Sequence, residues 1–360
     1  MTRCLPIAGR YLSQWSRGLG TRKKGCIVVL SGVLACAPTK PASSQDGAVP
    51  APDSGGSDSA APADSGMPPS DPDTWHEDCS RDEREQRMVD VGEVSLNVAC
   101  RGAGPTVVFL HGFPEWHYSW DAVMDELVDD YRLVAPDQRG YNTSDKPEAL
   151  SAYELPRLAE DILNLLPKIS EAPVILVAHD WGGPVGWLVA HTPGAHVRAF
   201  MSTNGPHPVR FAELIATDPD QQAASSYMEL FRSDLAETVM TPDYLADWFP
   251  FLSADDLELY KEAWAQEGAI TGGLNWYRAN SLQPEATAAL LAERSATIEQ
   301  PVSVLWGEDD TAVLLSNAEG LEGYAPDLVV ETFPGVDHWI EHRIPGEVAR
   351  AIRELDARAE

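Results

Sequence analysis

Three short segments of the chain each place an acidic or imidazole side chain just after an apolar run. The run 174–178 leads into His-Asp-Trp-Gly-Gly at 179–183, the run 301–306 into Gly-Glu-Asp-Asp at 307–310, and residues 337–339 read Asp-His-Trp. The first segment is typical of a sharp strand-turn-helix elbow, which exposes its central side chain at the carboxyl edge of a sheet. That central residue is Asp180. The chain order is therefore a candidate nucleophile, then an acid, then His338.

A carboxylate at the nucleophile position indicates a particular two-step chemistry. Asp180 is ionised at neutral pH and can attack an sp³ carbon without a general base, which forms an alkyl ester. His338, oriented by an acid, can then activate the water that hydrolyses this ester. Asp309 and Asp310 are neighbouring candidates for the orienting acid.

Five motifs resemble the epoxide hydrolase branch of the α/β-hydrolase superfamily. They are His-Gly-Phe-Pro-Glu at 111–115, Asp-Gln-Arg-Gly-Tyr at 137–141, and the segments at 179–183, 307–310 and 337–339. The resemblance runs from about residue 85 to the C-terminus. It implies an epoxide hydrolase that uses Asp180 as nucleophile and His338 as base. The family's spacing selects Asp310 over Asp309 as the acid.

The resemblance also assigns groups around the nucleophile. The backbone N–H groups of Phe113 and Trp181 are expected to bind the oxyanion that forms during ester hydrolysis. An epoxide opens to an alkoxide, so acidic O–H donors are needed opposite Asp180, and Tyr227 and Tyr277 occupy the matching cap segments.

Further residues have expected places near the site. The substrate pocket is expected to include His111, Pro114 and Trp276. Glu115 fits the family motif and also a salt bridge at the rim of the site.

Two other classes of function stay open. Haloalkane and fluoroacetate dehalogenases share most of these motifs and use the same displacement with halide as the leaving group. Halide binding needs two N–H donors, and Phe113 stands where asparagine would be one of them. Trp181 could supply one donor, and the indole N–H of Trp248, Trp264 or Trp276 could supply the second. The other alternative is a non-catalytic surface lipoprotein on a hydrolase scaffold.

The elements that must position these residues follow from the apolar pattern. Short, nearly continuous apolar runs at 106–110, 132–136, 174–178, 197–203, 301–306 and 328–332 favour strands buried on both faces, hence a parallel sheet. Residues 84–90 and 94–100 predict a hairpin. Helical patterns near 120–128, 155–169, 183–191 and 344–358 alternate with the strands, as in a doubly wound α/β sheet.

This alternation defines the expected fold and domains. The fold class is α/β: an α/β-hydrolase fold with a mostly parallel, doubly wound sheet and an inserted helical cap. The core is expected at 81–206 and 297–360. The cap is expected at 207–296, which is rich in helix formers and contains no strand-like run.

The charge limits the partners. The 360 residues carry 26 Lys+Arg and 56 Asp+Glu, a formal net charge of −30, which argues against nucleic acid and anionic membrane surfaces. No glycine-rich phosphate loop or metal-ligand cluster is evident, so no cofactor or metal is expected. The expected partners are a small epoxide and water. The sequence predicts no oligomeric state.

The N-terminal part predicts export. Residues 1–35 contain six basic and no acidic side chains, and a short apolar stretch at 26–35 ends at Cys36. This arrangement resembles a bacterial lipoprotein signal, with lipidation of Cys36 and anchoring at a cell-envelope membrane. Plain secretion and a mis-assigned start are the alternatives. Pro, Gly, Ser, Ala and Asp supply 32 of the 40 residues at 36–75, so residues 36–80 are expected to form a disordered linker.

Cysteine usage agrees with export. Five cysteines are too few for a disulfide scaffold, and none forms a Cys-x-x-Cys pair. If the leader is removed and Cys36 is lipidated, only Cys79 and Cys100 remain. Cys100 ends one hairpin strand and Cys79 shortly precedes the other, so the two are expected to meet as a disulfide or to stay as two free thiols.

Overall fold

The computed structural model describes residues 74–360. The predicted signal peptide at 1–35, the lipidation site Cys36 and the linker up to residue 73 lie outside the described residues. No helix in the described part is both long enough and apolar enough to cross a membrane.

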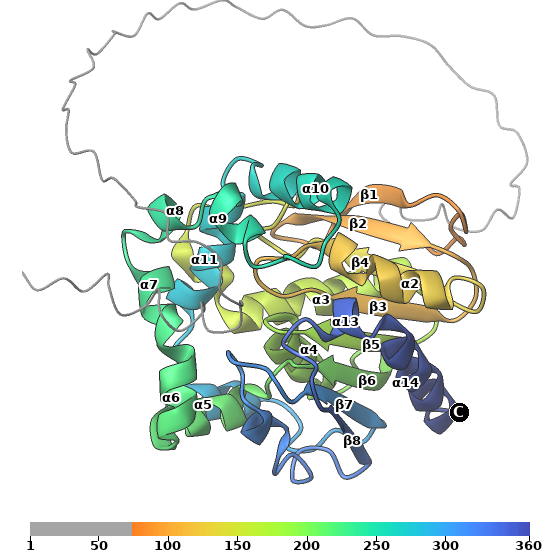
Figure 1. The fold of residues 1–360 in the computed structure, drawn as a ribbon. Helices are drawn as coiled ribbons and strands as arrows, with labels where there is room; N and C mark the ends of the chain where they lie inside the picture. The colour runs from red at the N-terminus through yellow and green to blue at the C-terminus, as the bar shows by residue number, and fades with distance from the viewer. Residues whose placement is uncertain (1–73) are drawn as a thin grey trace, which may run out of the picture. The chain divides into compact units, whose positions relative to one another are not determined.

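The core of the domain is a single mixed sheet (Figure 1). Its strands lie in the order β1-β2-β4-β3-β5-β6-β7-β8, and β2 pairs antiparallel with both β1 and β4, whereas all other neighbours are parallel. The strands are β1 (Glu85–Asp90), β2 (Ser95–Arg101), β3 (Thr106–Leu110), β4 (Arg132–Pro136), β5 (Val174–His179), β6 (Val197–Thr203), β7 (Val302–Gly307) and β8 (Leu328–Phe333). The predicted hairpin, parallel strands and α/β-hydrolase fold class are confirmed.

The parallel strands are apolar throughout because helices cover both faces of the sheet. On one face, Val108, Leu176 and Val304 pack with residues of α3 (Leu155–Ile169) and α4 (Gly182–Ala190). On the other face, the sequence neighbours of these residues in the same strands pack with α2 (Asp121–Leu127) and α14 (Pro345–Arg358). Successive side chains of a strand point to opposite faces, so each parallel strand contributes to two apolar layers.

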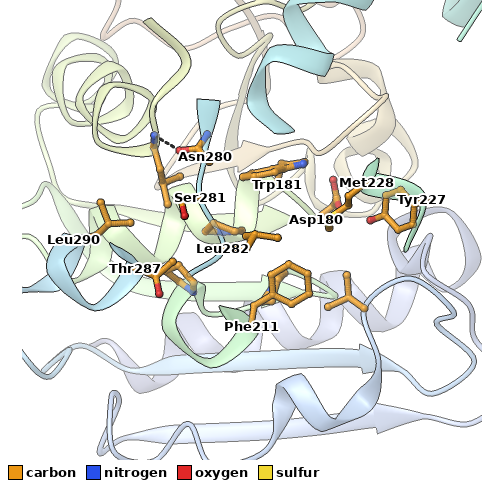
Figure 2. Close-up of a pocket in the computed structure, with 15 residues that line it drawn as sticks. Asp180, Trp181, Phe211, Tyr227, Met228, Asn280, Ser281, Leu282, Thr287 and Leu290 are labelled. Atoms are coloured by element: carbon orange, nitrogen blue, oxygen red, sulfur yellow. Dashed lines mark hydrogen bonds between the residues drawn. The ribbon is translucent and has the colours of Figure 1, made fainter. Parts of the chain in front are cut away.

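Helices connected by turns and irregular segments make up the described chain between β6 and β7. They are α5 (Pro208–Thr217), α6 (Pro219–Ala224), α7 (Met228–Arg232), α8 (Ala236–Val239), α9 (Pro242–Ala246), α10 (Ala254–Trp264), α11 (Ala269–Ala279) and α12 (Pro284–Leu291). The short helix α13 (Ile340–Arg343) precedes α14. The 3-10 helices are η2 (His117–Trp120), η3 (Leu150–Tyr153), η4 (Ser225–Tyr227) and η5 (Leu315–Ala318). This insert and the carboxyl edge of the sheet together line one cavity (Figure 2).

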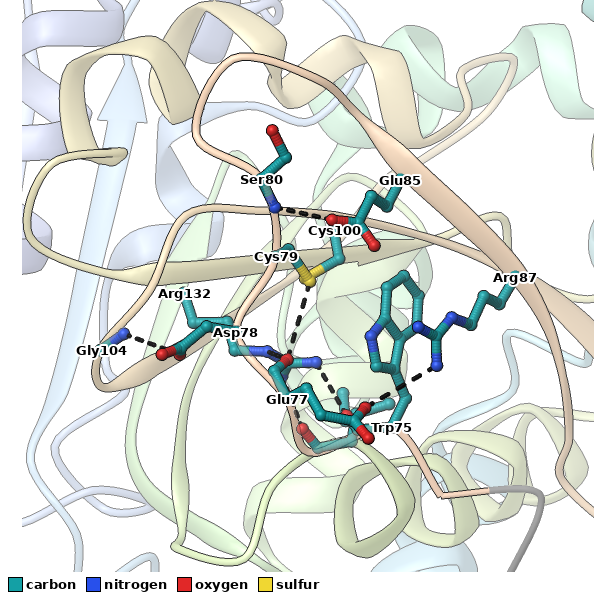
Figure 3. Close-up of a disulfide and its surroundings, with 11 residues drawn as sticks. Trp75, Glu77, Asp78, Cys79, Ser80, Glu85, Arg87, Cys100, Gly104 and Arg132 are labelled. Carbon is teal, nitrogen blue, oxygen red and sulfur yellow. Dashed lines mark hydrogen bonds and ion pairs between the residues drawn. A yellow bond between two sulfur atoms is a disulfide. The ribbon is translucent and has the colours of Figure 1, made fainter.

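The predicted linker ends earlier than expected. Trp75 is only 1% exposed, and its backbone N–H donates to the carbonyl of Lys168. The guanidinium of Arg132 donates to the carbonyls of Trp75, Glu77 and Ile169, and the guanidinium of Arg87 covers the Trp75 ring (Figure 3). Residues 74–80 therefore belong to the core, because one large aromatic side chain anchors an otherwise polar segment.

A disulfide joins Cys79 to Cys100, with the two Cα atoms 5.9 Å apart (Figure 3). It links the segment before β1 to the end of β2. Backbone hydrogen bonds between Cys79 and Gly102, and between Gly102 and Ser80, run beside it. The bridge therefore ties the N-terminal segment of the described domain to the sheet.

Replacing both cysteines with serine should lower the free energy of unfolding by about 3 kcal/mol, because the bridge closes a loop with a sequence separation of 21. Urea unfolding of the oxidised protein and the double variant measures the difference. Equal free energies of unfolding would show that the bridge contributes nothing to stability.

Candidate active site

The elbow after β5 presents Asp180 in a backbone conformation that few residues adopt. Asp180 has φ +47° between the end of β5 and the start of α4. Gly112 lies so close that a Cβ there would be 2.3 Å from the Asp180 Cβ. The 111–115 loop therefore needs glycine at this position to approach the carboxylate.

The two oxygens of the Asp180 carboxylate have different surroundings. Oδ1 accepts a hydrogen bond of 2.8 Å from the Phe113 backbone N–H. The peptide bond between Phe113 and Pro114 is cis. Oδ2 lies 3.5 Å from His338 Nε2. Burial opposes ionisation, but the hydrogen bond and charge of His338 outweigh it and hold the pKa of Asp180 below its ordinary value. Asp180 is therefore a carboxylate at neutral pH.

His338 is held by the acid that the motif spacing selected. Its Nδ1 lies 2.7 Å from Asp310 Oδ2, whereas Asp309 is exposed. Asp310 Oδ1 accepts hydrogen bonds from the backbone N–H groups of Ala312 and Val313. Asp310 is thus fixed in the orientation that directs His338 Nε2 toward Asp180.

Sequence reasoning missed Asn204, which supports this acid. Asn204 follows β6 with φ +42°, and its side-chain N–H donates to Asp310 Oδ2 over 2.7 Å. Its Oδ1 accepts from the backbone N–H of Gly307. Its position at the carboxyl end of a parallel strand was the signal that could have found it.

Two carboxylates determine the charge of His338. Burial favours the neutral ring, but the charges and hydrogen bonds of Asp310 and Asp180 raise the pKa of His338 well above its ordinary value. His338 is therefore an imidazolium while Asp180 is ionised. Conversion of Asp180 to an uncharged ester removes one of the two carboxylates and lowers that pKa.

The two cap tyrosines pack against each other, and Tyr277 also packs against residues next to the nucleophile. The Tyr227 and Tyr277 rings pack edge-on against each other, with centroids 6.4 Å apart. The Tyr277 ring packs edge-on against Trp181 and Phe113, with centroids 5.1 and 5.3 Å apart. Burial first, and then neighbouring charges including that of Asp180, raise the pKa of both hydroxyls, so both stay protonated.

A small cavity lies over Asp180, and most of its lining is apolar (Figure 2). Tyr227 lines it, with its hydroxyl directed toward Asp180 (Figure 2). Tyr277 was expected to point into the same cavity. Tyr277 is not among the residues that line it, because its ring is held between Phe113 and Trp181.

Three residues expected in the substrate pocket do not line this cavity. The Trp276 indole N–H donates to the carbonyl of Arg139, and the buried His111 ring accepts from the backbone N–H of Gln138. Pro114 lines a smaller cavity on the 111–115 loop, and its carbonyl accepts from the indole of Trp264. Their polar atoms are engaged in holding loops, so the pocket prediction for these residues is wrong.

One group of described residues offers metal-ligating atoms. Ligand atoms of Glu115, His179 and Glu341 lie within 4.8 Å of one another, and all three side chains are buried. Glu115 is buried, so of its two interpretations the salt bridge at the rim of the site does not hold.

Comparison with known proteins agrees with this geometry. The family model described as "alpha/beta hydrolase fold" matches residues 105–341. The AB hydrolase superfamily protein YfhM of Bacillus subtilis is 35% identical over 281 residues, 74% of this chain and 96% of that protein. Epoxide hydrolase A of Mycobacterium tuberculosis is 31% identical over 321 residues, covering 75% of this chain and 96% of that one. The crystal structure of a Bacillus megaterium epoxide hydrolase with an inhibitor aligns with TM-score 0.68 and 29% identity, over 75% of this chain and 100% of that one.

Proposed function

The chain belongs to the epoxide hydrolase branch of the α/β-hydrolase family, and on that premise we propose that it opens epoxides to vicinal diols through an ester on Asp180. The observation that carries the proposal is the arrangement around an ionised Asp180: His338, held by Asp310, lies 3.5 Å from one of its oxygens, and Tyr227 lines the same cavity as Asp180.

In the first step, Asp180 attacks one carbon of the epoxide ring. Phe113 holds Oδ1, so Oδ2 is the oxygen that bonds to carbon as the ring C–O bond breaks. The released alkoxide takes a proton from the hydroxyl of Tyr227, whose ring packs against that of Tyr277. The step leaves a neutral ester that carries a free hydroxyl group.

In the second step, water hydrolyses the ester. Loss of the Asp180 charge lowers the pKa of His338. His338 then releases its proton, which protonates Tyr227 again. Neutral His338, oriented by Asp310, removes a proton from water, which attacks the acyl carbon. The backbone N–H of Phe113 stabilises the oxyanion on Oδ1. Collapse expels the diol as an alkoxide, which takes a proton from His338. The Asp180 carboxylic acid then passes its own proton to His338, which restores the starting carboxylate and imidazolium.

The engaged indoles favour this reading over a dehalogenase. A halide site on Trp181 needs a second N–H donor beside its indole, and the Trp181 ring packs edge-on against Tyr277. The indole N–H groups of Trp264 and Trp276 donate to backbone carbonyls. The donors from Trp264 and Trp276 are therefore occupied within the protein, whereas the Tyr227 hydroxyl faces the nucleophile.

Turnover of two neutral substrates by the purified chain tests the proposal. Styrene oxide should yield the diol, and 1-bromobutane should release no bromide. Bromide release without diol formation would establish the dehalogenase instead.

We also propose that the protein is exported and held at a bacterial cell-envelope membrane by a lipid on Cys36. Supporting observations are the basic leader, the apolar stretch before Cys36 and a disulfide typical of oxidising compartments. Growth with labelled palmitate should label the wild-type chain and not the Cys36→Ser variant. Equal labelling of the two would contradict lipidation at this residue.

A further inference from the structure

The imidazole of His111 lies next to the peptide unit that holds the nucleophile, and the reaction above gives it no role. His111 directly follows β3, its side chain is fully buried, and it does not line the cavity over Asp180. One peptide unit, between Gly112 and Phe113, nevertheless joins the two side chains. Its carbonyl oxygen lies 2.9 Å from His111 Nδ1, and its N–H donates to Asp180 Oδ1 over 2.8 Å.

The contacts of the two ring nitrogens fix where the His111 proton lies. Nε2 lies 3.0 Å from the backbone N–H of Gln138, which can only donate, so Nε2 is an acceptor without a proton. Nδ1 faces the carbonyl oxygen of Gly112, which can only accept, so Nδ1 carries the proton and donates it. Burial lowers the pKa of His111 below its ordinary value, in agreement with a neutral ring. His111 is therefore neutral, and its single N–H points at the Gly112 carbonyl.

Gln138 holds His111 from two sides. Besides the backbone bond to the ring, the side-chain amide of Gln138 donates to the carbonyl oxygen of His111. The Tyr141 ring packs edge-on against the imidazole, with centroids 4.7 Å apart. Both His111 and Gln138 are buried, so water does not compete for these hydrogen bonds. The imidazole is therefore held in the orientation that directs Nδ1 at Gly112.

We propose that His111 is a positioning residue for ester hydrolysis: its Nδ1–H donates to the carbonyl of the Gly112–Phe113 peptide and so orients and polarises the N–H that stabilises the oxyanion on Asp180. The proposal rests on the two-step reaction proposed above. A donor at the carbonyl end of a peptide strengthens the N–H at its other end, because linked hydrogen bonds polarise one another. The backbone N–H of Glu115 also donates to the Gly112 carbonyl, so loss of the His111 donor weakens this N–H without releasing the loop.

The two steps of the reaction respond to the Phe113 N–H in different ways. In ester formation Asp180 loses its negative charge, so a weaker donor destabilises the reactant carboxylate and does not slow the attack. In hydrolysis a negative charge develops on Oδ1, so a weaker donor raises the barrier. Loss of the His111 donor should therefore slow hydrolysis and leave ester formation unchanged or faster. A general loss of packing around Asp180 would slow both steps.

Two substitutions of His111 each keep one of its hydrogen bonds. Asparagine places an amide N–H near the position of Nδ1 and keeps the donor to Gly112. Glutamine places its amide near the position of Nε2, where its oxygen can accept from Gln138, and removes the donor to Gly112. His196→Gln is the matched control, because His196 is a partly buried histidine before β6, at the edge of the sheet opposite the site.

Rapid mixing with styrene oxide times ester formation and hydrolysis separately in each variant. His111→Gln should slow hydrolysis by about 10- to 100-fold, at or below the effect of removing an oxyanion donor outright, without slowing ester formation. His111→Asn should hydrolyse the ester about tenfold faster than His111→Gln, and His196→Gln should match the wild type in both steps. Equal slowing of both steps in His111→Gln, or equal hydrolysis rates in the two His111 variants, would overturn the proposal. Failure of the wild type to form diol would instead refute the proposed function.

Nuclear magnetic resonance of the wild-type protein tests the hydrogen bonds without a variant that must fold. Long-range ¹H–¹⁵N spectra of protein labelled at histidine distinguish a protonated ring nitrogen from an unprotonated one. His111 should carry its proton on Nδ1 and none on Nε2. His196 should show the opposite pattern at alkaline pH, because its Nε2 lies 3.0 Å from the carbonyl oxygen of Ser170. A proton on His111 Nε2 would overturn the proposal whether or not the enzyme turns over epoxides.

Discussion

Replacing His338 with glutamine should trap the enzyme as the Asp180 ester. The carboxylate needs no base to attack an epoxide, so ester formation should proceed. Without a base to activate water, hydrolysis should slow by about 100- to 10,000-fold. Mass spectrometry of peptides after mixing with styrene oxide should find the alkyl group on Asp180.

The Asp180→Ala variant is the control and should form no adduct and no diol. A His338→Gln variant that releases diol at the wild-type rate would show that His338 does not activate the water. An alkyl group found on a residue other than Asp180 would show that this other residue is the nucleophile.

Removing both cap hydroxyls should give the next largest effect. Tyr227 and Tyr277 stay protonated because burial and nearby charge raise their pKa values, so Tyr227 can donate to the developing alkoxide with Tyr277 in support. Replacing either tyrosine with phenylalanine should slow ester formation by about 10- to 1000-fold, as for the loss of an oxyanion donor. The double variant should be slower still, and stopped-flow measurement of ester formation separates this loss from any change in hydrolysis.

Tyr244→Phe is the matched control, because Tyr244 also belongs to the helices between β6 and β7 but lies on α9. It should leave both steps unchanged. A Tyr227→Phe,Tyr277→Phe variant with the wild-type rate of ester formation would remove the tyrosines from the reaction and strengthen the dehalogenase alternative.

The parts of the fold that could be predicted are those with a strong local signal. The strand β5 is apolar on both faces, and the small residues around Asp180 allow one sharp turn, so the elbow could be read from adjacent positions. The choice of Asp310 over Asp309 depended on a spacing of three residues from Gly307 at the end of a strand. These features require no knowledge of distant contacts.

The parts that could not be predicted depend on contacts between distant residues. The strand end before Asn204 could have marked it as a site residue, but its partner Asp310 lies 106 positions later, so its role in holding this acid follows only from the fold. Trp75 lies next to a low-complexity segment, and only its contact with Lys168 shows that it belongs to the core. Glu115 and His342 are in contact but lie 227 positions apart in the chain, so no local sequence pattern indicates this contact.

The substrate pocket was predicted less well than the catalytic groups. Catalytic groups lie at strand ends, where chain order fixes them, whereas the cavity wall comes from turns and helices whose side chains take their directions from tertiary packing. Phe211 and Met228 line the cavity although neither belongs to a recognised motif. Trp276 lies next to Tyr277 in sequence, but its indole turns to the carbonyl of Arg139.

A single turnover in ¹⁸O-labelled water tests the covalent ester on Asp180 most directly. Enzyme in excess over styrene oxide is mixed in labelled water, and both the diol and the peptide that contains Asp180 are analysed by mass spectrometry. Water attacks the acyl carbon in this mechanism, so the label should enter the Asp180 carboxylate and the first diol should carry none. Label in the diol after one turnover, with an unlabelled Asp180, would show that water attacks the epoxide directly and would contradict the covalent mechanism.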